Sequence, residues 1–126
     1  TMAGSFVRGR PGAGVQHIAF QTDDIFETSS QLAEAGFARL HIPRNYYSDT
    51  QAAFDLDDAR TAQLQADHIL YDEDEYGRYY QLYGQAIFVG FFFEIVQRKG
   101  RYAGYGARNA PVRLAAQSKV RAAVAS

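Results

Sequence analysis

The sequence has 126 residues, of which 47% are apolar and 14% aromatic, with a net charge of -1 and no cysteine. This composition predicts one folded domain with a modest core, and it excludes global disorder, a disulfide-stabilised scaffold and a thiolate metal site. The small net charge gives no bulk attraction for nucleic acid or anionic membranes. No apolar run is long enough to cross a bilayer and no signal peptide is visible, so a cytoplasmic protein is expected.

The spacing of apolar and turn residues predicts an α+β domain. Residues 1–14 are rich in Gly and Arg and are expected to form an arm or linker before a module at 15–126. Strands are predicted at 15–22, 37–42, 68–71, 78–83 and 91–97. Helices are predicted at 25–36, 45–54, 57–66 and 111–120, with Asp24 or Asp23 and Asp57 as N-caps and Gly36 as a stop. Because strands and helices do not alternate regularly, we expect a curved mixed or antiparallel sheet and a C-terminal helix.

Two polar residues stand out inside apolar strands. His17 lies in Gly-Val-Gln-His-Ile-Ala-Phe, and Glu94 lies in Phe-Phe-Phe-Glu-Ile-Val-Gln, the most apolar predicted strand. A lone strand histidine is commonly a core residue with a satisfied ring, and the glutamate could pair with Arg98 or face solvent. A carboxylate in so apolar a strand is costly to desolvate unless it is paired or binds a metal. Neighbouring strands of a curved sheet could bring both side chains to one point.

A metal site built on this pair would be incomplete. Two histidines and one carboxylate form the facial triad of non-haem iron oxygenases, which leaves positions open for substrate and oxygen. His17 and Glu94 supply two of these groups. The other histidines are His41, close to a proline, and His68, which begins a strand beside an acidic turn. Neither is expected to complete the site.

Several segments, in order, resemble the last module of the 4-hydroxyphenylpyruvate dioxygenase family. They are 14–20 with 22–25, Tyr46-Tyr47 after Pro43, Gln81-Leu82-Tyr83, 91–100, and 104–106 with Asn109. The resemblance covers nearly everything from Gly14 to Ala116. No single tripeptide is specific, but this number of matches in order is.

The resemblance implies a vicinal-oxygen-chelate (glyoxalase-like) fold, built from βαβββ modules that pair to form a cup around a metal. It implies that His17 and Glu94 are ligands of a divalent metal, iron(II) first, with Zn, Mn, Co or Mg as alternatives. The remaining family histidine lies in a preceding module that these residues do not contain. We therefore expect a fragment of a longer chain or a homo-oligomer, because a half-cup also leaves an apolar sheet face and an edge uncovered.

The same resemblance implies a substrate side of the cup. Gln81 matches a family glutamine that faces the active site, and it is the predicted catalytic and substrate-orienting residue, although a strand amide that satisfies a neighbour is an equal alternative. Tyr83, Tyr105 and Asn109 fall on positions that would line the cup or its lid, or else serve as core and cap residues. Gln16 also matches a family glutamine, but consecutive strand residues point to opposite faces, and it is adjacent to His17.

The departures from the dioxygenases concern the lid and the aromatic residues. After Asn109 the family carries a Phe that packs on the substrate ring, whereas Ala110 stands here. Tyr83 and Tyr105 place hydroxyls where the dioxygenases tend to have Phe, which suggests a more polar substrate or an inactive site. The ending 102–117 looks more like the dioxygenase-like C-terminal domain that is fused to a barrel in bacterial 3-dehydroshikimate dehydratases.

Three functions remain open. The first is an iron(II) dioxygenase module that acts on an aromatic 2-oxo acid in aromatic amino acid catabolism. The second is a dehydratase-associated domain that binds a metal and a small acid without catalysing the dehydration, and the third is a vestigial dimerisation module. The expected partner is a small aromatic or carbocyclic acid. Basic clusters near Arg8 and Arg98 are offset by acidic residues, so neither a nucleic acid nor a membrane is expected as a partner.

Overall fold

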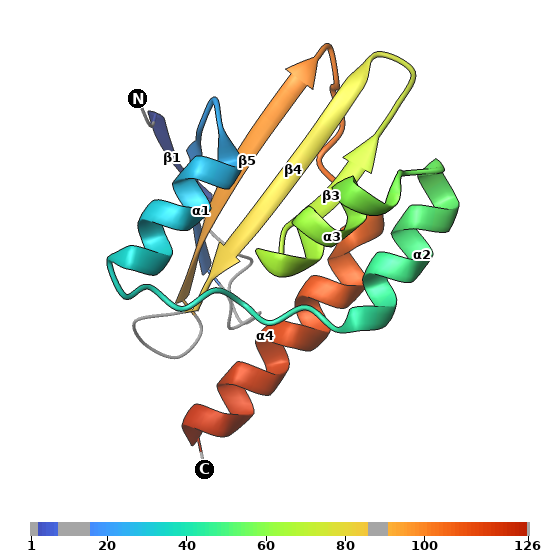
Figure 1. The fold of residues 1–126 in the computed structure, drawn as a ribbon. Coiled ribbons are helices and arrows are strands. Elements are labelled where there is room, and N and C mark those ends of the chain that lie inside the picture. The colour runs from blue at the N-terminus through green and yellow to red at the C-terminus, as the bar shows by residue number, and fades with distance from the viewer. Residues whose placement is uncertain (1–2, 8–15, 86–90, 126) are drawn as a thin grey trace.

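The computed structural model describes residues 3–7, 16–85 and 91–125 (Figure 1). The elements in chain order are β1 (Ala3–Val7), β2 (Gln16–Gln21), α1 (Ile25–Glu34), α2 (Arg44–Phe54), α3 (Asp58–Ala66), β3 (Leu70–Glu73), β4 (Gly77–Gly84), β5 (Phe91–Gly100), the 3-10 turn η1 (Ala107–Asn109) and α4 (Ala110–Ala125). From β2 onward this is the predicted βαβββ order, with α2 and α3 inserted after α1. Residues 8–14 of the predicted arm lie outside the described residues, as does Val15 at the start of a predicted strand.

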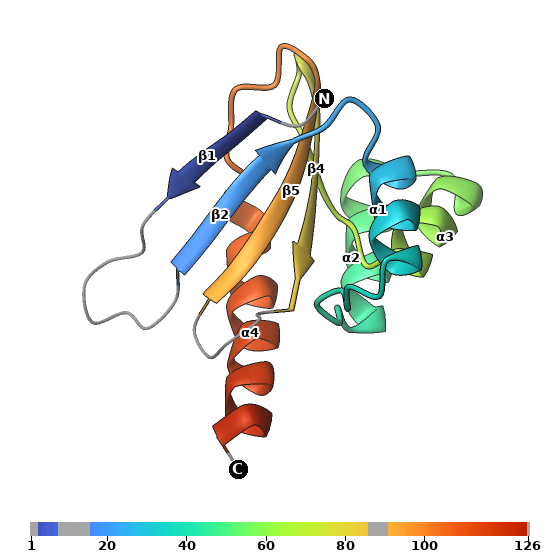
Figure 2. The ribbon, with the colours of Figure 1, turned by 90° about the vertical axis from the view of Figure 1, so that its left-hand side faces the viewer.

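The strands form one mixed sheet in the order β1-β2-β5-β4-β3. β2 and β5 run parallel, while the other neighbouring strands run antiparallel. Ala3–Val7, which belongs to the predicted arm, pairs with β2 from Gln21 back to His17, so this part of the arm is a strand of the sheet. Figure 2 shows the curved sheet with α1, α2 and α3 gathered on one side. The predicted α+β domain with a curved mixed sheet and a C-terminal helix is confirmed.

Alternation of side chains along the strands gives the sheet two different faces. On the first face, Tyr80, Leu82 and Ile95 form a core with Ile25 of α1 and Leu64 of α3, all of them buried. The second face is hollow, and the η1 turn and the first residues of α4 form its far wall. The apolar face therefore holds the module together, while the opposite face is left to build a site.

The helix signals in the sequence act as expected. The Asp24 carboxylate accepts a hydrogen bond from the Glu27 amide at 3.1 Å, and the Asp57 carboxylate accepts one from the Arg60 amide at 2.6 Å. Both bonds satisfy amides that have no partner within the first turn of a helix. Gly36 follows α1 with a φ of 87°, a left-handed conformation that glycine adopts without strain.

Two predicted strands differ from the structure. Residues 37–42 form only an isolated bridge between Arg39 and Gly84, because β3 already occupies the same edge of β4 up to Gln81. The strand predicted at 68–71 begins at Leu70 instead, because His68 has a left-handed φ of 57° that ends α3 and cannot continue into a strand. None of the described helices is long and apolar enough to cross a membrane.

Candidate metal centre

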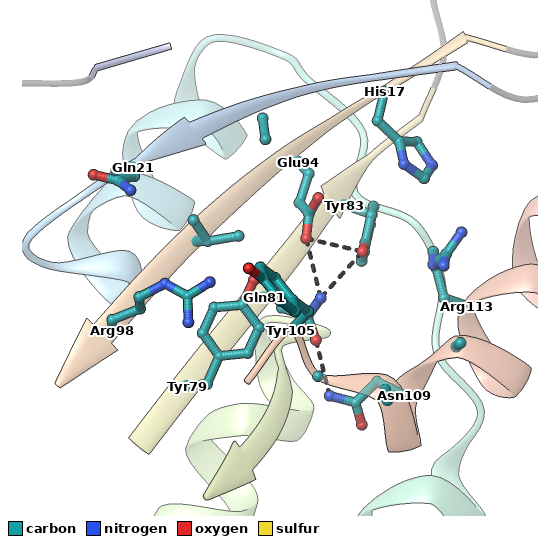
Figure 3. A pocket seen from close by; sticks show the side chains of 15 residues that line it. His17, Gln21, Tyr79, Gln81, Tyr83, Glu94, Arg98, Tyr105, Asn109 and Arg113 are labelled. Carbon is teal, nitrogen blue, oxygen red and sulfur yellow. Dashed lines mark hydrogen bonds between the residues drawn. The ribbon is translucent and has the colours of Figure 1, made fainter. Parts of the chain in front are cut away.

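His17 and Glu94 lie on the hollow face of the sheet. Parallel pairing of β2 with β5 sets Ala19 opposite Glu94, so His17 lies one strand away and two residues back, on the same face. On the other side of β5, Tyr83 of β4 is opposite Glu94. Both predicted ligands line a cavity of about 380 Å³ (Figure 3). Strand pairing thus brings together two residues that are far apart in the sequence.

The Glu94 carboxylate is oriented by two neighbours from β4. Its Oε2 accepts hydrogen bonds from Gln81 Nε2 at 3.0 Å and from the Tyr83 hydroxyl at 2.9 Å. Gln81 and Tyr83 are each only 4% exposed, so both donors are buried, whereas Glu94 itself is half-buried at the cavity. Burial, and then the nearby Glu94 charge, raise the pKa of the Tyr83 phenol, which therefore stays a donor at neutral pH. No hydrogen bond from the described residues reaches Glu94 Oε1, which leaves that oxygen available to a ligand.

A hydrogen-bond chain continues from Glu94 across the cavity wall to α2. Gln81 Oε1 accepts a hydrogen bond from Asn109 Nδ2 at 2.9 Å, and Asn109 Oδ1 accepts one from the Tyr46 hydroxyl at 2.7 Å. The Tyr46 hydroxyl also accepts from the Tyr71 amide at 2.8 Å. Asn109 is 1% exposed, so the hydrogen-bond chain is buried where it passes from the sheet to η1. The Gln81 amide group therefore makes hydrogen bonds with both its nitrogen and its oxygen.

The His17 ring is half-buried beside α4. Its Nε2 lies 3.1 Å from Gln117 Nε2, and its ring centroid lies 5.7 Å from that of Tyr83. Burial lowers the pKa of His17 below 6.5, and the positive charge of Arg113 lowers it further, against smaller opposing effects of Glu94 and Gln117. The imidazole is consequently neutral at pH 7, which is the form that can donate a lone pair to a metal.

Some predicted residues lie elsewhere or at the margin. His41 and His68 pack against each other with ring centroids 4.6 Å apart, and neither lines the cavity. Tyr105 lies at the cavity mouth and is 83% exposed. The side chain of Gln16 lies outside the described part of the structure, although its backbone belongs to β2.

The alternative ion pair between Glu94 and Arg98 does not form. Arg98 stacks on the Tyr79 ring, with its Cζ 4.4 Å from the ring centroid, and its NH1 group donates to the Gly104 carbonyl at 2.6 Å. Among the described residues, a salt bridge joins Arg39 and Asp67, and neither of these two residues lines the cavity. The hydrogen-bond donors to Glu94 are therefore neutral side chains, and no cation among the described residues pairs with its carboxylate.

Cavity residues that the sequence reasoning missed lie mainly on β2, β4 and β5, with one on α4. They include Ala19, Gln21, Tyr79, Arg98 and Arg113. Strand alternation from His17 could have indicated Ala19 and Gln21, because residues two apart share a face. The side of α4 that faces the sheet was harder to predict, since the helix has no wide apolar stripe.

Comparison with known proteins places this geometry in a family context. No family model matches the chain. It is 48% identical to 3-dehydroshikimate dehydratase from Pseudomonas aeruginosa over 114 residues, which are 90% of this chain and 18% of that protein. It is 36% identical to 4-hydroxyphenylpyruvate dioxygenase from Legionella pneumophila over 107 residues, 82% of this chain and 30% of that protein. The chain thus spans less than a third of the length of either relative.

A solved structure matches the fold as well as the sequence. It is described as a xylose isomerase-like TIM barrel/4-hydroxyphenylpyruvate dioxygenase fusion protein, and it is 48% identical with a TM-score of 0.77 over 82% of this chain and 17% of that one. This chain is a 4-hydroxyphenylpyruvate dioxygenase-like module. Its βαβββ order and mixed sheet are those of a vicinal-oxygen-chelate domain, as the resemblance predicted.

The donor set of the dioxygenase-like module fits part of a metal site. A neutral imidazole and a carboxylate share one cavity, and both are ligand types that suit iron and other first-row metals. The described residues contain no cluster of three or more potential His, Cys, Asp or Glu ligands. The described part of the module therefore offers two such ligands from its own side chains.

Proposed function

We propose that this chain is the metal-binding module of a dioxygenase-like protein, in which His17 and Glu94 hold a divalent metal, iron(II) first. The observation that carries the proposal is the Glu94 carboxylate, which neutral donors orient on one oxygen while the other stays free, in the same cavity as a neutral His17. Hydrogen bonds to a ligating carboxylate fix its direction and raise metal affinity. Zn, Mn, Co and Mg remain alternative metals for the same donor pair.

The third ligand would come from outside the described residues. A preceding module of a longer chain, or a second copy of this chain, would supply it, as the pairing of βαβββ modules requires. The small share of each relative that this chain spans supports the first source. In either case the hollow face would become the interior of a closed cup.

The substrate proposed for this cup is a small aromatic or carbocyclic acid. The cavity volume of about 380 Å³ suits a single ring, because sites for small ligands commonly begin near 300 Å³. When bound, iron(II) would supply the activation of oxygen and of an oxo acid. The residues of the chain would orient Glu94 through Gln81 and Tyr83, keep His17 neutral, and close one wall of the cavity with η1.

Two observations favour a second function. Identity to the dehydratase is 48%, against 36% for the dioxygenase, over similar lengths. Ala110 also lines the cavity where the dioxygenase lid would place an aromatic ring. On this alternative the module binds a metal and a small acid as a domain of a 3-dehydroshikimate dehydratase, without dioxygenase activity of its own.

Metal analysis of matched variants tests the proposal. The wild type, His17→Ala, Glu94→Gln and the control His41→Ala would be loaded with iron(II) without oxygen, desalted and analysed for bound metal. We expect metal in the wild type and control, and a strong loss in both site variants. Full metal content in the site variants would refute the proposed ligands. Oxygen uptake with 4-hydroxyphenylpyruvate by the loaded wild type would then favour the dioxygenase function over the dehydratase domain.

A further inference from the structure

Arg113 places a positive charge on the side of α4 that faces the cavity. It lies one turn before Ala116 and Gln117, which are 6% and 1% exposed, and it is itself half-buried against the cavity (Figure 3). A guanidinium in such a position has lost part of its hydration, and it gains most from an anion that restores this loss. We therefore expect this guanidinium to bind an anion.

The described part of the chain gives Arg113 little to bind. Its NH1 group makes one long hydrogen bond, 3.4 Å to Gln117 Oε1, and its Cζ lies 5.7 Å from the centroid of the Tyr83 ring. No carboxylate among the described residues lies within salt-bridge distance of it. Because a guanidinium carries several N–H donors in a planar fork, most of them remain free to bind a ligand.

The other charged groups of the cavity each have hydrogen-bond partners among the described residues. Arg98 stacks on Tyr79, lies beside the rings of Tyr102 and Tyr105, and donates to the Gly104 carbonyl. Glu94, the cavity's carboxylate among the described lining residues, accepts from Gln81 and Tyr83. Two arginines and one glutamate give this lining an excess of positive charge when His17 is neutral. The cavity is thus complementary to an anion, and Arg113 is the cation with donors to spare.

We propose that Arg113 binds the carboxylate of the ligand, and that the ligand is a single-ring acid seated in this cavity with its carboxylate at α4. Arg113 would recognise both oxygens of the carboxylate through its planar fork, which a neutral amide or alcohol cannot match. This inference rests on the proposed function only in taking this cavity as the ligand site. It assigns to α4 the selection of acids over neutral rings, a role distinct from holding a metal.

The test compares an acid with its neutral analogue. Binding of 4-hydroxybenzoate and 4-hydroxybenzamide would be measured by calorimetry on chelator-treated and on metal-loaded protein. The variants are Arg113→Gln, Arg113→Lys and the control Lys119→Gln, which removes the same charge from an exposed position of the same helix. We expect the wild type and control to prefer the acid by about tenfold or more in both preparations, as a charge-assisted hydrogen bond allows.

The expected result for Arg113→Gln is nearly equal binding of the two rings with unchanged metal content, and Arg113→Lys should recover part of the preference. The inference is overturned if the wild type does not distinguish acid from amide. It is also overturned if Arg113→Gln keeps the wild-type preference, including a preference seen only with metal, which would assign the carboxylate to the metal instead. If the wild type binds no metal but still prefers the acid in an Arg113-dependent way, the proposed metal site is refuted and the inference about Arg113 stands.

Discussion

Replacement of Gly106 by alanine tests whether the hydrogen-bond chain positions Glu94. Gly106 precedes η1 with a φ of 65°, and a Cβ added there would lie 2.3 Å from Gln81 Oε1. That oxygen cannot simply swing away, because it accepts from Asn109 while the other end of the amide donates to Glu94. The substitution should therefore displace Gln81 and disturb the orientation of Glu94.

Gly36 offers a matched control for the backbone cost. Its φ is 87°, and a Cβ added there would meet nothing within 4 Å. Both alanine variants should lose about 1–2 kcal/mol from the left-handed conformation. Gly106→Ala should lose about 1–3 kcal/mol more, because it disrupts two hydrogen bonds, one buried and one partly buried, that each contribute about 0.5–1.5 kcal/mol.

Two measurements distinguish the glycine variants. In thermal unfolding, the Tm of Gly106→Ala should fall several degrees below that of Gly36→Ala, at about 4 °C per kcal/mol for a domain of this size. In metal titration, Gly106→Ala should bind about 10–100-fold more weakly, the usual effect of losing a partner behind a ligand, whereas Gly36→Ala should match the wild type. Equal Tm losses and equal metal affinities in the two variants would refute the idea that this hydrogen-bond chain positions Glu94.

The remaining predictions concern pH and helix capping. Burial, and then the nearby His41 and Arg39, lower the pKa of His68 below 6.5. Just below pH 6.5 the unfolded chain therefore binds more protons than the folded chain, and the stability of the fold should decrease as the pH falls through that range. His68→Asn keeps an acceptor for the Ile42 amide and tolerates the left-handed φ. It should therefore reduce part of the decrease in Tm between about pH 7 and about pH 5. An unchanged dependence of Tm on pH would show that His68 does not cause this decrease. Asp57→Ala should cost about 1 kcal/mol in urea unfolding, because the Arg60 amide loses its cap, whereas Asp49→Ala, at an exposed position within α2, should stay within about 0.5 kcal/mol of the wild type.

Local signals in the sequence were sufficient for most of the elements. The caps at Asp24 and Asp57 and the stop at Gly36 act between residues only a few positions apart, so the sequence alone predicted them. The extended run 37–42 misled because strand propensity does not say whether an edge is free, and β3 had already taken most of that edge of β4. The Gly and Arg content of residues 1–14 predicts an arm, whereas in the structure residues 3–7 form a strand because they pair with β2.

The candidate site shows the same division more sharply. His17 and Glu94 could be singled out from the sequence because a polar residue inside an apolar strand is visible locally, and the family resemblance paired them. The hydrogen-bond chain from Tyr46 through Asn109 and Gln81 to Glu94 could not be predicted from the sequence, since its members come from α2, η1, β4 and β5. Arg113 was hidden for another reason, because the side of α4 that faces the sheet depends on how the helix docks. Periodicity determines which residues of one element share a face, but hydrogen bonds between distant strands and the packing of α4 determine which faces meet, and only the tertiary structure decides that.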